Sequence, residues 1–314
     1  MPPLHLIVET LLYAVLPAAL VAALVMTAVT WAGRGKLAPL AAALALAGGF
    51  VVGSGVRDLV NQSKLPPTEP RLATAEVLQT SLELTRRGMP WNRLPLGALV
   101  AMLVGLVARL PWVPSQLGWC LRGAVVALVV AWVLPATVAA EGTPAELRAP
   151  LWWLPAFTAV ILAGWALLES LAARPPSGSI PLAMMLTALT ATGVVLYADL
   201  PRAPEAATVL AGALGGLTLV AWWRRVDGGG AVPGVAVLLP GLLFMVHRET
   251  YSNVPWVAFA LAAGAPLILA LTLLPPFRAW QGMRLHLLRF ALLLAPLAVA
   301  GALAVAHGSE GSLD

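Results

Sequence analysis

Long apolar runs recur along the whole chain, and short segments between them hold most of the polar residues. A helix that crosses a bilayer needs about 20 mostly apolar residues, within a range of about 17–25. The runs lack the apolar–polar alternation of membrane barrel strands, so we interpret them as helices. The sequence therefore predicts about ten membrane-spanning helices, at residues 4–31, 38–57, 94–110, 119–140, 151–172, 180–198, 205–223, 231–247, 255–274 and 286–307.

Two of these runs differ from the others in length. The first is much longer than the apolar region of about 7–15 residues in a signal peptide, and no Lys or Arg precedes it. We interpret it as a retained helix. The run at 94–110 is the shortest, and two alternatives stay open for it: a full crossing, or a re-entrant segment that would reverse the orientation of every later helix.

The segment 58–93 is the longest polar stretch, and we expect it to form an extramembrane loop. Within it, residues 71–87 place apolar side chains along one side of a helix, and Gly88 and Pro90 are typical of a helix end. These apolar side chains are Leu72, Ala75, Leu78 and Leu82. We predict an amphipathic helix at 71–87 that lies on the membrane or caps the bundle. A plain connector packed on neighbouring helices is the alternative.

Composition agrees with this pattern. Hydrophobic residues make up 60% of the chain and charged residues 11%, and the mean hydropathy is +0.88. Soluble domains average about 45–50% apolar and about 25% charged residues. The sequence therefore predicts an all-α, polytopic integral membrane bundle that forms a single transmembrane domain over residues 1–314 and has the lipid bilayer as its partner.

The chain is basic, with an isoelectric point near 10.1, but its cations are scattered between apolar runs rather than gathered on one face. This distribution argues against nucleic-acid binding and is typical of cytoplasmic loops in membrane proteins. The odd-numbered loops, counted from the N-terminus, hold Arg34, Lys36, Arg109, Arg122, Arg174, Arg224, Arg225, Arg278, Arg284 and Arg289, whereas the short even-numbered loops hold Arg148, Arg202 and Arg248. For a bacterial inner (plasma) membrane, we therefore expect both termini outside. The cations of segment 58–93 count against this orientation when they are included.

Motifs for catalysis or cofactor binding are absent from the sequence. It contains no HExxH motif, no paired Cys and His at zinc-ligand spacing, no Walker A motif, and one cysteine, Cys120, whose role stays open. We therefore assign no catalytic residue, cofactor or metal, and a non-enzymatic role is favoured.

Charged residues within apolar runs are costly to insert, so retained ones are candidates for function. Glu169 lies one turn before the end of its span, among leucines, with Arg174 as a simple partner five residues on. His247, Arg248 and Glu249 form the densest polar cluster, and their chemistry suits a proton-linked or anionic-ligand site. A polar helix end is the alternative for this cluster.

A second basic group enters the last span from its cytoplasmic side. Arg284, His286 and Arg289 are spaced so that contact with an anionic lipid headgroup is the simplest interpretation.

Prolines and small residues suggest an internal repeat. Pro155, Ala163-Gly164 and Pro175-Pro176 have the same spacing as Pro255, Ala263-Gly264 and Pro275-Pro276. Transporters are often built from such repeats, with the site at the interface between them. The leading hypothesis is therefore a permease for a small solute. The alternatives are a non-catalytic subunit or scaffold of a larger membrane complex, built with partner membrane subunits or as a homo-oligomer, and an intramembrane enzyme that acts on a lipid-linked substrate.

Overall fold

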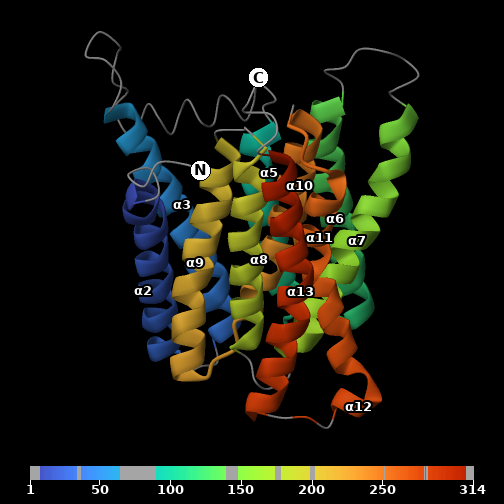
Figure 1. Ribbon diagram of the computed structural model, residues 1–314. Coiled ribbons are helices and arrows are strands. Elements are labelled where there is room, and N and C mark those ends of the chain that lie inside the picture. Colours follow the sequence, from blue (N-terminus) through green and yellow to red (C-terminus); the bar gives the residue numbers. More distant parts are fainter. Residues whose placement is uncertain are drawn as a thin grey trace.

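The computed structural model describes residues 8–33, 37–63, 90–138, 148–173, 178–198, 202–250, 252–278, 280 and 282–308. Every regular element in these ranges is a helix (Figure 1). In chain order they are η1 (Leu11–Val15), α2 (Leu16–Ala32), α3 (Ala38–Ser63), α5 (Pro90–Val107), α6 (Ser115–Val138), α7 (Arg148–Ala172), α8 (Ser179–Leu196), α9 (Arg202–Arg224), η3 (Gly229–Ala231), α10 (Val232–Glu249), α11 (Trp256–Gly264), η4 (Ala265–Leu273), α12 (Pro275–Arg278) and α13 (Gly282–Gly308).

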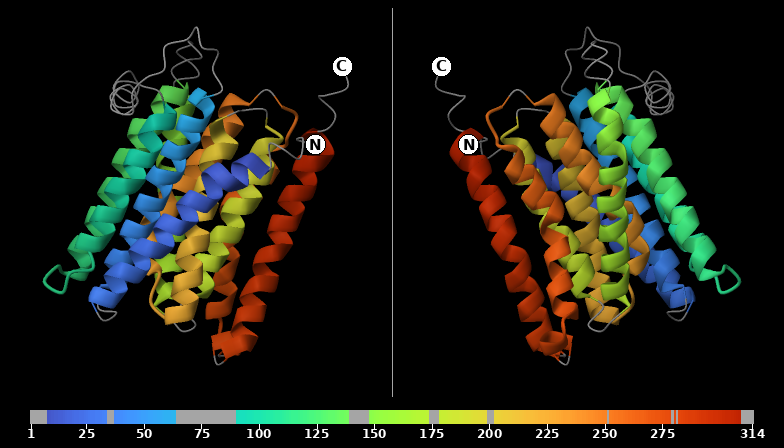
Figure 2. Two further views of the ribbon diagram at one scale, coloured as in Figure 1. Left: turned by 90° about the vertical axis from the view of Figure 1, so that its left-hand side faces the viewer. Right: turned by 90° about the vertical axis from the view of Figure 1, so that its right-hand side faces the viewer.

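Nine helices in the described ranges are long and apolar enough to cross a membrane. Helix α5 is shorter, with an apolar part at Arg93–Val107. The predicted class, an all-α polytopic membrane bundle, is confirmed. In Figures 1 and 2 the long helices run side by side; we call the end with α12 the lower end and the opposite one the upper end. The first helix begins and α13 finishes at the upper end.

Helix α10 forms the centre of the bundle. In the apolar part of its span 89% of the residues are buried, compared with 72% for α9 and 22% for the first span. Its buried residues cover all sides of the helix, from Val232 to Val246. A helix that is apolar all round is surrounded by other helices, and α10 packs against α5, α6, α7, α8, α9 and α11.

Small residues allow α2 to approach α3 and α9 closely. A Cβ atom on Gly49 of α3 would lie 2.7 Å from the Ala18 carbonyl oxygen, and one on Gly216 of α9 would lie 2.0 Å from that of Ala19. Gly53 and Gly212 repeat these contacts one turn away on each helix. Packing through small residues at four-residue spacing is a common way to join helices in lipid, where no hydrophobic force drives their association.

The span that begins at Trp256 changes helix type near its middle. It is α-helical to Gly264 and continues as the nine-residue 3-10 helix η4. Pro266 lacks the N–H that an α-helix would use to bond the Ala262 carbonyl, which explains why the change occurs here. A 3-10 segment longer than about four residues is uncommon. In the predicted repeat the residue that corresponds to Pro266 is Ala166, and there α7 stays α-helical to Ala172, so the two units differ in backbone.

Helix α3 extends beyond the span expected from the sequence. The chain was predicted to leave the helix at 57, but α3 continues to Ser63, and α5 begins at Pro90 rather than after 93. A contact with α9 explains the extension: Arg57 Nε donates to Glu205 Oε1 at 2.9 Å, and Asn61 Nδ2 donates to the same oxygen at 3.3 Å. The amphipathic helix predicted at 71–87 lies outside the described residues.

The Arg57–Glu205 pair offers a test of how α3 and α9 are held together. Only 10% and 25% of the two side chains are exposed, so replacing Glu205 by Gln leaves a mostly buried guanidinium without its counter-charge. We expect Glu205→Gln to lower the stability by about 1–2 kcal/mol, measured as the apparent melting temperature of the purified protein. In an Arg57→Gln background the same change should cost much less. Equal costs in both backgrounds would rule the pair out.

Candidate functional site

A cluster of charged side chains joins α5, α6 and α7 at the lower end of the bundle. We call it the Arg–Glu cluster: Arg109, Arg122 and Glu169. Arg109 Nε donates to Glu169 Oε1 at 2.6 Å, and Arg122 Nη2 donates to the same oxygen at 3.1 Å. Arg122 Nη1 lies 3.0 Å from Glu169 Oε2. One carboxylate therefore contacts two guanidinium groups, and side-chain exposures of 21%, 9% and 18% place the cluster close to the surface but mostly covered.

The turn between α9 and α10 completes the surroundings of Arg109. Arg109 Nη2 donates to the Gly229 carbonyl oxygen at 3.1 Å. The Gly229 N–H donates to Asp227 Oδ1 at 2.7 Å, which fixes the turn. A Cβ on Gly229 would lie 3.2 Å from Arg109 Nη2 and 3.1 Å from the Ala172 Cβ. Any residue other than glycine would therefore displace a neighbouring group here. The cluster is thereby attached to the central helix.

Two tryptophans cover Arg122. Its guanidinium carbon lies 4.6 Å from the centre of the Trp119 ring and 5.6 Å from that of Trp165, distances at which a cation is attracted to an aromatic face. Trp165 is fully buried. Neither its Nε1–H nor the Nε–H of Arg122 has a hydrogen-bond partner in the described part of the chain. Two buried donors therefore stay unsatisfied beside the cluster.

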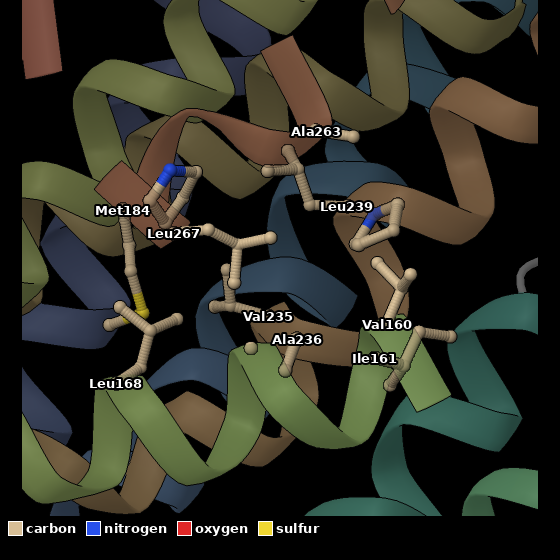
Figure 3. Close-up of a pocket in the computed structure, with 12 residues that line it drawn as sticks. Val160, Ile161, Leu168, Met184, Val235, Ala236, Leu239, Ala263 and Leu267 are labelled. Carbon is tan, nitrogen blue, oxygen red and sulfur yellow. The ribbon is translucent and has the colours of Figure 1, made fainter. Parts of the chain in front are cut away.

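A small apolar pocket of about 30 Å³ lies beside α10 (Figure 3). Helices α7, α8, α10 and α11 and the 3-10 segment η4 line it, with Gly164, Pro240 and Pro266 among the lining residues. Pro240 cannot donate to the carbonyl of Ala236, which also lines the pocket, so α10 carries a carbonyl without its usual helical partner there. The pocket thus combines apolar walls with a proline inside α10 and a change from α-helix to 3-10 helix.

Aromatic residues of α7, α10 and α11 lie closer to the upper end than the pocket does. The rings of Phe157 and Phe244 are 5.0 Å apart, one turn beyond Ile161 of α7 and Pro240 of α10 toward the upper end. Further up α10, the His247 ring packs against Phe259 of α11 at 5.3 Å. His247 Nδ1 is buried and has no hydrogen-bond partner among the described residues. These rings lie between the level of the pocket and the upper end of the bundle.

The structure separates the residues predicted to form sites. Glu169 lies at the lower end of α7, whereas His247, Arg248 and Glu249 form the upper end of α10 (Figure 1). Arg248 is exposed and Glu249 is partly buried. The loop that follows is attached to the turn after α8, because Thr250 Oγ1 donates to the Ala198 carbonyl oxygen at 2.6 Å. Glu169 and the His247 group are therefore not parts of one site.

The basic residues of α13 differ from one another in their surroundings. Arg284 is exposed, the His286 ring lies 4.9 Å from that of Trp222, and Arg289 is 97% buried and donates to Ser179 Oγ of α8. Lipid contact at these positions stays a prediction, and of the three residues Arg284 and His286 are the two that are not buried. The hydrogen bond of Arg289 connects α13 to α8.

Sequence reasoning identified Glu169 but not its partners. Arg109 and Arg122 are 60 and 47 residues away along the chain, and Arg174, the neighbour considered from the sequence, lies outside the described residues. The available signal was that both arginines lie at the same end of neighbouring spans as Glu169.

No protein-family model and no curated protein matches this chain. Its fold therefore defines its class: it is a multi-pass helical membrane protein that resides in a lipid bilayer.

Proposed function

We propose that this protein is a permease for a small solute, whose path runs along α10 through the apolar pocket. The pocket supports this proposal because two helix irregularities, Pro240 in α10 and the change from α11 to η4, face it together. Discontinuous helices that meet near the middle of the membrane are how many transporters build their sites, because freed backbone groups there can bind a solute.

Interacting side chains lie toward both ends of the bundle from the pocket. The Phe157–Phe244 pair and the His247–Phe259 pair lie toward the upper end, and the Arg–Glu cluster lies toward the lower end, where Leu168 lines the pocket and the next residue is Glu169. A volume of about 30 Å³ suffices for a water molecule but not for a metabolite. In this proposal the structure is a closed arrangement, and movement of η4 opens it.

The lower end is cytoplasmic in this proposal. Helix ends and short loops there carry Arg109, Arg224, Arg225, Arg278 and Arg284, which agrees with the tendency of cytoplasmic loops to be rich in Lys and Arg. The first helix then begins, and α13 finishes, outside the cell.

Cysteine accessibility tests the proposal without knowledge of the solute. In a Cys120→Ser background, Ala236→Cys places a thiol on the wall of the pocket. We expect a membrane-impermeant maleimide to label it from both faces of oriented vesicles, because a permease opens its site to each side in turn. Ala300→Cys, at a fully buried position of α13 outside the pocket lining, is the matched control and should stay unlabelled.

If Ala236→Cys is labelled no faster than Ala300→Cys, the path along α10 is wrong. That result would favour a non-catalytic subunit or scaffold. Copurification of stoichiometric partner chains from the native membrane would then identify the complex. Labelling from one face alone would also contradict a permease, because it shows a pocket that never opens to the other side.

A further inference from the structure

The Arg–Glu cluster carries more positive charge than its own carboxylate neutralises. Glu169 contacts the guanidinium groups of both Arg109 and Arg122. The Asp227 carboxylate accepts the Gly229 N–H, and among the described residues it forms no ion pair with either arginine. A positive charge close to the membrane core is costly unless an anion lies beside it.

Unused hydrogen-bond donors lie next to that charge. Arg122 Nε and Trp165 Nε1 are buried and have no acceptor among the described residues. A buried donor without an acceptor is costly, so two of them beside one cation favour a ligand that brings acceptor oxygens. The cluster is also accessible from one side, because 21% of the Arg109 side chain is exposed.

We propose that Arg109, Arg122 and Trp165 form a binding site for a phosphate-bearing group. A guanidinium group binds phosphate through two parallel N–H donors, and a phosphate supplies both the missing charge and the missing acceptors. In this site the Glu169 carboxylate occupies some of the positions that the phosphate oxygens would take. It holds the two arginines together and competes with the ligand for them. The phosphate is either free in solution or part of an anionic lipid headgroup. The observations that support this site do not involve the pocket along α10, so failure of the cysteine test does not affect it.

The test measures the apparent melting temperature of the full-length protein, purified in a neutral detergent. One arm adds inorganic phosphate, with potassium chloride at equal ionic strength as the reference. The other adds phosphatidylglycerol as mixed micelles with that detergent, with phosphatidylcholine as the reference. We expect a rise of about 4 °C at saturation in at least one arm. A rise with inorganic phosphate identifies a free anion site, and a rise with phosphatidylglycerol alone identifies a headgroup site.

Three variants distinguish the cluster from general electrostatics. Arg122→Gln should abolish the rise, whereas Glu169→Gln should enlarge it, because the competing carboxylate is removed. Arg224→Gln is the matched control: Arg224 is also at the lower end but is exposed and lies over Trp223, so the rise should be unchanged. If Arg122→Gln does not fold, Arg122→Lys, which keeps the charge but loses the paired donors, should lose at least half of the rise.

The proposal is overturned if neither arm stabilises the wild-type protein. It is also overturned if the arginine variant that folds shows the full wild-type rise, or if Glu169→Gln shows a smaller one.

Discussion

Replacing Gly216 by Ala should separate α2 from α9 and leave little folded protein. The added Cβ would lie 2.0 Å from the Ala19 carbonyl oxygen and 2.9 Å from the Ala19 Cα. A carbon and an oxygen approach no closer than about 3.3 Å, so one helix must move by more than 1 Å. The contact is with backbone, and no side chain can rotate to relieve it.

The cost of this change is large because neighbouring contacts cannot compensate. A Cβ on Gly212, on the same side of α9, would lie 2.7 Å from the Val15 carbonyl oxygen. A shift of α2 therefore disturbs the contacts of both turns of α9. Overpacking usually costs about 1–3 kcal/mol, and we expect Gly216→Ala to reach at least the upper value. The measurement is the yield of monodisperse protein in size-exclusion chromatography, together with its apparent melting temperature.

Gly193→Ala in α8 is the control for this experiment. No atom lies within 4 Å of the position that its Cβ would occupy, and Ala is favoured over Gly in a helix by up to about 1 kcal/mol. This variant should be as stable as the wild type or slightly more stable. If both alanine variants behave alike, the close approach of α2 and α9 is wrong.

The helical membrane class could be predicted from the sequence because it depends on run length alone. Apolar residues must continue for about 20 positions wherever a helix crosses lipid, and that requirement is visible without any tertiary contact. The end of α3 shows the limit of this reasoning. Arg57 resembles the polar boundary of a span, but Glu205 of another helix neutralises it, so the helix continues to Ser63.

The site could be predicted only in part for the same reason. Glu169 was noticeable as a carboxylate among leucines. Its partners, however, depend on how α5, α6 and α7 pack, and residue spacing along one helix contains no information on this. The pocket was even harder to predict from the sequence. Pro266 was visible, but a proline in a membrane helix is compatible with a bend, a break or a regular helix, and only the fold shows that η4 follows and faces Pro240.

The second large effect is expected at Glu169. Glu169→Gln keeps the size of the side chain but leaves Arg109 and Arg122 without the carboxylate that holds them together. Removing one partner of a buried charge pair costs about 3–5 kcal/mol. Because 18% of the Glu169 side chain is exposed, we expect about 3 kcal/mol, or roughly 6 °C in apparent melting temperature for a chain of this length.

The double variant distinguishes repulsion between the arginines from simple loss of hydrogen bonds. Arg122→Gln alone should cost less than Glu169→Gln, because Arg109 and Glu169 stay paired. In Glu169→Gln/Arg122→Gln one of the two uncompensated charges is gone, so the combined cost should be at least about 1 kcal/mol smaller than the sum of the single costs. Additive costs would mean that each side chain acts through its own packing. For Arg122 the lost packing would be its stacking on Trp119. The cluster would then consist of three separate contacts rather than one electrostatic unit.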